Sequence, residues 1–124
     1  MARVLVVDDD VLVRETVRLS LQAAKHSVRD AKNGREALDV LEREQFDLVI
    51  SDIIMPDMDG IELIRTTRKL YPKCRILAMS GGGRSRNVDY LRMSRDLGSH
   101  WTLAKPFTPE QLAKAVDDAL ATAP

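Results

Sequence analysis

The sequence predicts an α/β domain in which helices cover both faces of a parallel β-sheet. Two observations lead to this fold class. Short apolar runs alternate five times with longer amphipathic stretches along the chain. Three of the runs also carry consecutive Val, Ile or Leu, without the polar alternation of a strand that has one face in water. Strands buried on both faces are typical of parallel sheets.

Five segments have the length and composition of strands. They cover residues 4–7, 27–30, 47–51, 75–79 and 101–104. Each is separated from the next by enough residues for a crossover helix, which parallel strands require. We therefore expect five parallel strands, each followed by a helix.

The intervening segments have the apolar spacing of helices. Val13, Val17 and Leu21 form one stripe on the first helix, and the third and fourth helices are expected around residues 61–70 and 88–97. Two helix starts have capping signals. Asn33 stands three residues before Glu36, and Thr108 precedes Pro109 and a glutamine at the third helical position.

Length and charge limit the function classes. The chain has 124 residues, which indicates one domain, and its 19 Lys and Arg balance 19 Asp and Glu. Zero net charge removes the electrostatic term that sequence-independent nucleic-acid binding requires, so direct nucleic-acid contact is not expected. A single cysteine, Cys74, excludes an internal disulfide. With no secretory leader and no long apolar run, we expect a cytoplasmic protein without membrane contact.

Polar residues follow the apolar runs with unusual regularity. The first run leads into Asp8, Asp9 and Asp10, and the third, fourth and fifth lead into Asp52, Ser80 and Lys105. Because ligands of open parallel sheets bind beyond the carboxyl ends of the strands, these residues are expected to share one small volume.

Several carboxylates in one volume need a proton or a cation to compensate them. Mg²⁺ is the economical choice, since it binds one or two carboxylates and keeps positions for phosphate oxygens. With Lys105 as a fixed cation and Ser80 as a hydroxyl, the set suits phosphoryl transfer, and a carboxylate can itself accept the group.

Four motifs in this order resemble those of the response-regulator receiver domains of two-component signalling systems. They are VLVVDDD at residues 4–10, DLVISDIIMPDMDG at 47–60, AMS at 78–80 followed by glycines, and KPF at 105–107. Together they span nearly the whole chain, and each falls at the end of an expected strand.

The resemblance implies a flavodoxin-like, doubly wound (βα)5 sheet of order 2-1-3-4-5. It implies that residues 1–124 form a single receiver domain with no output domain. It further implies a signalling protein that catalyses only its own phosphorylation and dephosphorylation. Its partners would be a histidine kinase or phosphotransfer protein that donates the phosphoryl group and an unknown downstream protein.

The resemblance also carries residue roles over to this chain. Asp52 matches the phosphoacceptor, Asp9 the direct Mg²⁺ ligand, and Asp8 a ligand that acts through water. The carbonyl of Ile54 would complete the protein ligands of the ion. Ser80 and Lys105 match the hydroxyl and the ammonium that face the phosphoryl group, and the Lys105–Pro106 peptide is expected to be cis.

Two positions depart from the family pattern. Thr102 stands where most relatives carry a switching aromatic residue, and Trp101 lies one residue earlier, which places it on the opposite face of the strand. Residues 81–83 are all glycine. We hypothesise that phosphorylation is instead read through ordering of residues 81–87 and a shift of the fourth helix.

Alternatives remain for several of these residues. Asp10 is interpreted as the cap of the first helix. An Asp-nucleophile phosphatase of the haloacid dehalogenase type would carry a second acid at position 54, where the chain has isoleucine. A pseudo-receiver, a binding module not regulated by phosphorylation, is the main alternative. A weak homodimer, in which arginines at 84, 86, 92 and 95 meet Asp117 and Asp118, is a further hypothesis.

Overall fold

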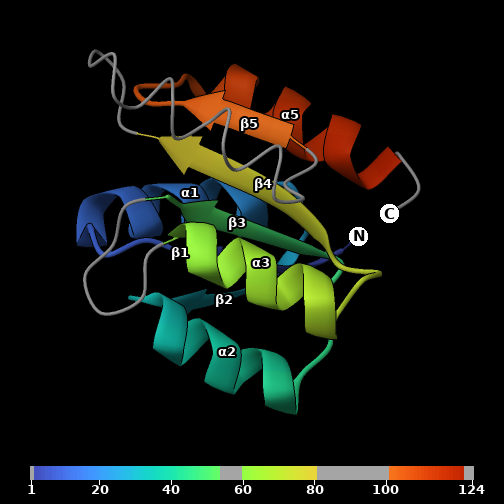
Figure 1. The fold of residues 1–124 in the computed structure, drawn as a ribbon. Helices are drawn as coiled ribbons and strands as arrows, with labels where there is room; N and C mark the ends of the chain where they lie inside the picture. The colour runs from blue at the N-terminus through green and yellow to red at the C-terminus, as the bar shows by residue number, and fades with distance from the viewer. Residues whose placement is uncertain (1, 54–59, 81–100, 122–124) are drawn as a thin grey trace.

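Five parallel strands form one sheet in the order β2-β1-β3-β4-β5, as predicted (Figure 1). The computed structural model describes residues 2–53, 60–80 and 101–121, except for the side chain of Ser80. The strands are β1 (Arg3–Val7), β2 (Ser27–Ala31), β3 (Leu48–Asp52), β4 (Arg75–Ser80) and β5 (Trp101–Ala104). The helices are α1 (Val11–Ala23), α2 (Gly34–Arg43), α3 (Gly60–Leu70) and α5 (Pro109–Ala121).

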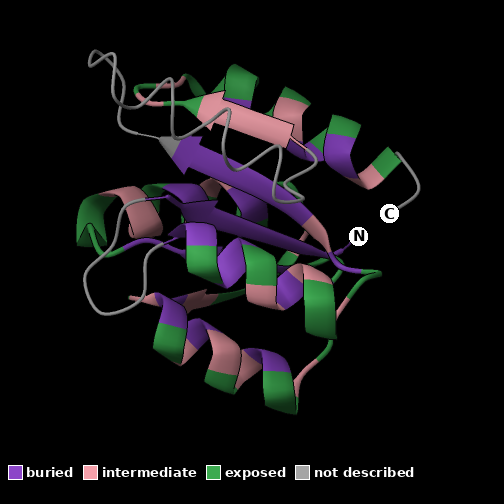
Figure 2. Cartoon of the chain, in the orientation of Figure 1, coloured by how far each residue is buried: buried purple, intermediate pink, exposed green. Residues whose placement is uncertain are grey.

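Alternate residues of the central strands supply two separate cores. Val4 and Val6 of β1 pack toward α1 and α5, whereas Leu5 and Val7 pack toward α2 and the first half of α3. All four side chains are fully buried. This arrangement explains why the strands read as continuous apolar runs, because both faces of the sheet are covered (Figure 2).

The helix caps follow the sequence signals. The side chain of Asp10 accepts hydrogen bonds from the amides of Leu12 and Val13, which confirms its interpretation as a cap. At α5, Thr108 and Gln111 form a reciprocal capping box, with distances of 2.8 and 3.0 Å. These contacts satisfy amides that the helices themselves leave unpaired.

The strand ends differ slightly from the prediction. The predicted third strand, residues 47–51, in fact begins at Leu48 and ends at Asp52, which pairs in register with Met79 of β4. The ladder therefore extends one residue further than the apolar composition indicates. As a result, the Asp52 carboxylate projects from the sheet itself and its backbone is held by strand pairing.

Register on β5 confirms the expected faces of Trp101 and Thr102. Trp101 pairs with Leu77, and both belong to the core shared with α1 and α5. Thr102 pairs with Ala78, which lies in the small core on the α3 face. The predicted fourth helix, residues 88–97, lies outside the described residues. Among the described helices, none is long and apolar enough to cross a membrane.

Candidate functional site

The carboxyl edge of the sheet brings together side chains from three strands that are distant in sequence. β1 lies between β2 and β3 and is hydrogen-bonded to both, so Asp8 and Asp9, which follow β1, lie beside Asp52 at the end of β3. Lys105 reaches the same place from the end of β5. Sheet topology therefore assembles four of the predicted site residues.

The three acids form a compact cluster. One carboxylate oxygen from each of Asp8, Asp9 and Asp52 lies within 4.8 Å of the others. Asp8 is fully buried and the Asp52 side chain is 12% exposed, whereas Asp9 is exposed. A divalent cation with oxygen ligands suits this donor set, because two buried carboxylates repel each other and the exposed one leaves an open side for water.

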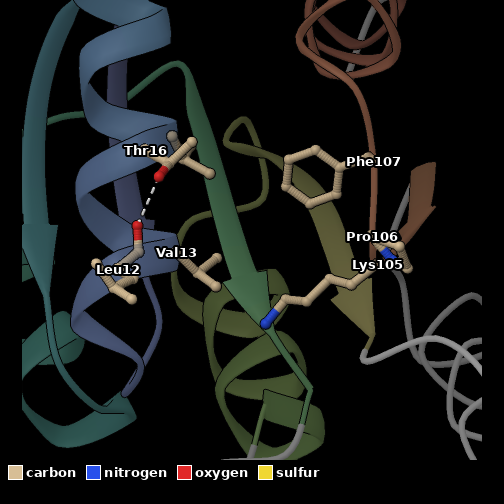
Figure 3. Close-up of a pocket in the computed structure, with 7 residues that line it drawn as sticks. Leu12, Val13, Thr16, Lys105, Pro106 and Phe107 are labelled. Atoms are coloured by element: carbon tan, nitrogen blue, oxygen red, sulfur yellow. Dashed lines mark hydrogen bonds between the residues drawn. The ribbon is translucent and has the colours of Figure 1, made fainter.

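Lys105 is the cation that faces these acids. Its Nζ lies 2.8 Å from Asp8 Oδ2 and 3.7 Å from Asp52 Oδ1, and its side chain is 18% exposed. Figure 3 shows the side chain extending from the start of the Lys105–Phe107 segment toward the end of β3. The Lys105–Pro106 peptide is cis, as expected. One ammonium only partly compensates three carboxylates.

The environment of Asp52 raises the pKa of its carboxyl group from 3.8 to about 6. Burial is the largest cause, and the negative charges of Asp8 and Asp9 raise it further. Lys105 and the Ile53 amide, which donates to Asp52 Oδ1 at 2.9 Å, act in the opposite direction. Burial and the neighbouring carboxylates together outweigh Lys105 and the Ile53 amide, so the ionised form of Asp52 is disfavoured unless a further cation binds nearby.

Asp8 is held on all sides by hydrogen bonds. Its Oδ1 accepts from the Asp10 amide at 2.8 Å, and its own amide donates to the Ala31 carbonyl at 3.2 Å. Its carbonyl accepts from Arg14 Nη1 at 2.7 Å. The sequence prediction missed Arg14. The available signal was its place one helical turn after the three aspartates.

Gly60, at the start of α3, lies directly against the backbone of the Asp52 strand end. A Cβ atom at this position would lie 2.2 Å from the Asp52 carbonyl oxygen and 2.4 Å from the Ile53 Cα. Both atoms belong to backbone, so no side-chain movement could relieve the overlap. A glycine is therefore required for α3 to approach Asp52 this closely.

An apolar cleft of about 360 Å³ opens beside Lys105, between α1 and the segment that precedes α5 (Figure 3). Leu12, Val13, Pro106 and Phe107 contribute its walls. Leu12 is 78% exposed at the rim. The cleft presents apolar surface next to the acid cluster, because Lys105 borders both.

Other predicted site features are not covered by the described residues. Ser80 is the last residue of β4 and pairs with Ala104, but its side chain is not described. The carbonyl of Ile54, residues 81–87, and the arginines of the predicted homodimer surface lie outside the described residues. Their predicted roles stay predictions.

The described site can hold a cation and present a nucleophile. Asp52 offers a partly exposed carboxylate, and Asp8 and Asp9 offer the additional oxygens that a hard divalent ion requires. Lys105 provides a positive charge for oxygens of a group bound to Asp52. These are the elements of phosphoryl transfer, in which positioning and charge neutralisation supply most of the catalysis.

Comparison with known proteins identifies relatives over nearly the whole chain. It is 39% identical over 110 residues to the response regulator MprA of Mycolicibacterium vanbaalenii, covering 89% of this chain and 46% of that protein. It is 31% identical to the sporulation initiation phosphotransferase F of Bacillus subtilis, covering 92% of this chain and 90% of that protein. The chain spans about half the length of MprA.

Solved structures agree with these sequence relatives. The Vibrio cholerae chemotaxis response regulator CheY4 superposes with a TM-score of 0.88 at 36% identity, covering 97% of this chain and 99% of that chain. NtrX from Brucella abortus superposes with a TM-score of 0.91 at 29% identity, covering 97% of this chain and 27% of that chain. The family model for the response regulator receiver domain matches residues 4–117. The chain therefore belongs to the response regulator receiver domain family.

Proposed function

We propose that this receiver domain accepts a phosphoryl group on Asp52 from a phosphohistidine of a histidine kinase or phosphotransfer protein. The observation that carries the proposal is the arrangement around one carboxylate. Oxygens of Asp8 and Asp9 lie within 4.8 Å of an Asp52 oxygen, and the Lys105 ammonium lies 3.7 Å from Asp52 Oδ1. The family membership supports the same role.

Asp8, Asp9 and Asp52 would hold Mg²⁺, with the carbonyl of Ile54 as a further ligand that the family resemblance implies. When bound, the ion supplies positive charge to the oxygens of the transferred group. The residues fit this ion because their oxygens converge from two buried side chains and one exposed side chain. Lys105 keeps its contact with Asp8 and can pair with a phosphoryl oxygen on Asp52.

The proposed transfer forms one bond and breaks one bond. A carboxylate oxygen of Asp52 attacks the phosphorus, and the bond between phosphorus and the donor imidazole nitrogen breaks, with its electron pair returning to that nitrogen. The product is an acyl phosphate on Asp52. Attack of water on the phosphorus later releases inorganic phosphate and restores the carboxylate. The Ser80 hydroxyl would face the phosphoryl oxygens during the phosphorylated state.

The surface beside the site supports a protein as the donor. The apolar cleft lined by Leu12, Val13, Pro106 and Phe107 borders Lys105, and Val11 and Leu12 are exposed at the start of α1. Apolar surface at the rim of a polar site is typical of protein-binding regions. A donor protein docked there would bring its phosphohistidine to the edge of the sheet where Asp52 lies.

The test is incubation of the chain with Mg²⁺ and acetyl phosphate, followed by intact-mass measurement. The wild type is expected to gain one phosphoryl group, and Asp52→Asn is expected to gain none. Asp10→Asn is the matched control, because asparagine caps a helix as well as aspartate does and the Asp10 side chain accepts from the Leu12 and Val13 amides at the start of α1. This variant is expected to gain the group as the wild type does.

Removal of Mg²⁺ with a chelator is expected to prevent the mass increase in the wild type. A wild type that gains no group in the presence of Mg²⁺ would contradict the proposal and favour the pseudo-receiver. Continuous release of phosphate from many esters would instead indicate a phosphatase.

A further inference from the structure

We infer that Arg14 is a positioning residue that orients the proposed metal-binding acids through the backbone that carries them. The inference rests on the proposed function, because it concerns the Mg²⁺ site formed by Asp8, Asp9 and Asp52. The described hydrogen bonds of Arg14 go to the Asp8 carbonyl and to Asp30 rather than to the carboxylates of Asp8, Asp9 or Asp52. Arg14 acts on the backbone that carries Asp8 and Asp9.

The Arg14 guanidinium has two partners, one directly after β1 and one in β2. Nη1 donates to the carbonyl oxygen of Asp8 at 2.7 Å, and Nε donates to Asp30 Oδ2 at 3.1 Å. The Arg14 side chain is 15% exposed and that of Asp30 is 38% exposed, so the hydrogen bond to the Asp8 carbonyl is the more shielded of the two. Charged hydrogen bonds of this kind are stronger and shorter than those between neutral groups.

The carbonyl that Arg14 holds belongs to the peptide between Asp8 and Asp9. The orientation of this peptide plane determines the direction in which the Asp9 Cα–Cβ bond leaves the chain. Asp9 is exposed, so packing does little to direct its carboxylate. The proposed direct ligand of the ion therefore depends on backbone orientation, and Arg14 supplies a hydrogen bond that controls it.

Asp30 fixes the other side of the guanidinium. Asp30 lies in β2, which pairs with β1 in register, and Asp8 donates from its amide to the Ala31 carbonyl. The end of β2 thus holds the Asp8 peptide both directly and through Arg14. A planar guanidinium can serve two such partners at fixed angles, whereas the single ammonium of lysine cannot reproduce this geometry.

The experiment compares Mg²⁺ binding to Mg²⁺-free protein by isothermal titration calorimetry. The variants are Arg14→Gln, Arg14→Lys and, as the matched control, Arg18→Gln. Arg18 lies one turn further along α1, where it pairs with Glu15 and Gln22. Arg14→Gln is expected to raise the Mg²⁺ Kd about 10-fold, the effect typical of removing a residue that orients a metal ligand. Arg14→Lys is expected to recover only part of this loss, and Arg18→Gln to change nothing.

A second measurement separates positioning from general destabilisation. The rate of phosphorylation by acetyl phosphate is measured against Mg²⁺ concentration. In Arg14→Gln, half-maximal rate is expected to require about 10-fold more Mg²⁺ while the maximal rate stays close to that of the wild type. A purely structural role would lower the melting temperature without this shift in Mg²⁺ dependence.

The outcomes distinguish this inference from the proposed function. If the wild type and Arg14→Gln bind Mg²⁺ with the same Kd, the role of Arg14 is wrong and the proposed function stands. If the wild type binds no Mg²⁺, both are wrong. If Arg14→Gln does not fold, Asp30→Asn decides, because it leaves Arg14 in place but loosens its orientation. A raised Kd in that variant supports the inference and an unchanged Kd overturns it.

Discussion

The two edges of the sheet both carry charged residues but arrange them differently. At the amino edge, the Arg3 amide donates to Asp47 at 2.9 Å and its guanidinium pairs with Glu44, which also binds Arg29 at 3.0 Å. The Arg3 guanidinium lies over the Phe46 ring as well. At the carboxyl edge, within the described part of the chain, three carboxylates face the Lys105 ammonium, and one of those carboxylates is fully buried.

The difference lies in whether each charged group has a partner of opposite sign. At the amino edge, positive and negative groups pair with each other near water, so these charges are compensated without a bound ion. At the carboxyl edge, burial and then the negative charges of Asp8 and Asp9 raise the pKa of Asp52, and the clustered carboxylates favour binding of a cation. Cavity size alone would have placed the candidate site at the amino edge. The groove near Glu44 and Cys74 has a volume of about 890 Å³, whereas the cleft beside Lys105 has about 360 Å³.

The strongest test of this contrast removes one cation from each edge. Lys105→Met leaves Asp8 buried without its partner and is expected to lower the free energy of unfolding by about 4 kcal/mol at pH 7.5 without Mg²⁺. Arg3→Met is expected to lower the free energy of unfolding much less, because Arg3 is exposed and its removal leaves no buried charge without a partner. Urea unfolding of both variants measures the difference. Equal losses would show that the two edges do not differ in this way.

Asp52→Asn is expected to stabilise the Mg²⁺-free protein at pH 7.5 by about 3 kcal/mol. The pKa of Asp52 rises from 3.8 to about 6, so between these values the folded state binds more protons than the unfolded state. The contribution of Asp52 to stability therefore falls as pH rises from about 4 to about 6. The difference between variant and wild type should disappear near pH 4.

Urea unfolding across this pH range, with and without Mg²⁺, measures the effect. Saturating Mg²⁺ is expected to stabilise the wild type more than the variant, because the variant lacks one carboxylate ligand. A variant that is less stable than the wild type at pH 7.5 without Mg²⁺ would contradict the raised pKa.

Gly60→Ala is expected to lower the free energy of unfolding by about 2 kcal/mol, since the added Cβ overlaps backbone atoms of Asp52 and Ile53. Relief of this overlap requires the backbone at Asp52 or α3 to move, and this movement is expected to slow phosphorylation of Asp52. Lys69→Ala, at an exposed position of the same helix, is the control and should leave both quantities unchanged. Thermal unfolding and the acetyl phosphate reaction provide the two measurements.

The smallest expected effect concerns Cys74, near the amino edge. Burial and the nearby Asp47 raise the pKa of its thiol to about 12, so the reactive thiolate is scarce at pH 8. Iodoacetamide is expected to leave the folded protein unmodified and to alkylate it once in denaturant, as measured by intact mass. Alkylation at the same rate in both conditions would contradict the buried environment.

The sequence predicted the strands well and the contacts of the site less well. Runs such as residues 4–7 mark strands because buried parallel strands need apolar side chains on both faces. Asp52 could be singled out because it follows such a run. Arg14 could not, since its partner Asp30 lies on a strand whose neighbour depends on sheet order. An arginine on a helix is most often a surface residue, and the place of Arg14 one helical turn after the three aspartates does not by itself reveal its partners.

Local sequence located the ends of each strand to within one residue, because side-chain periodicity and β-branched composition act over a few neighbouring positions. Tertiary structure decided that Asp8, Asp9 and Asp52 share one volume, that Lys105 is their cation, and that Asp52 binds its proton at a higher pH than usual. The reason is that electrostatic interactions depend on distance and on exclusion of water. Both quantities exist only after strands far apart in sequence have become neighbours.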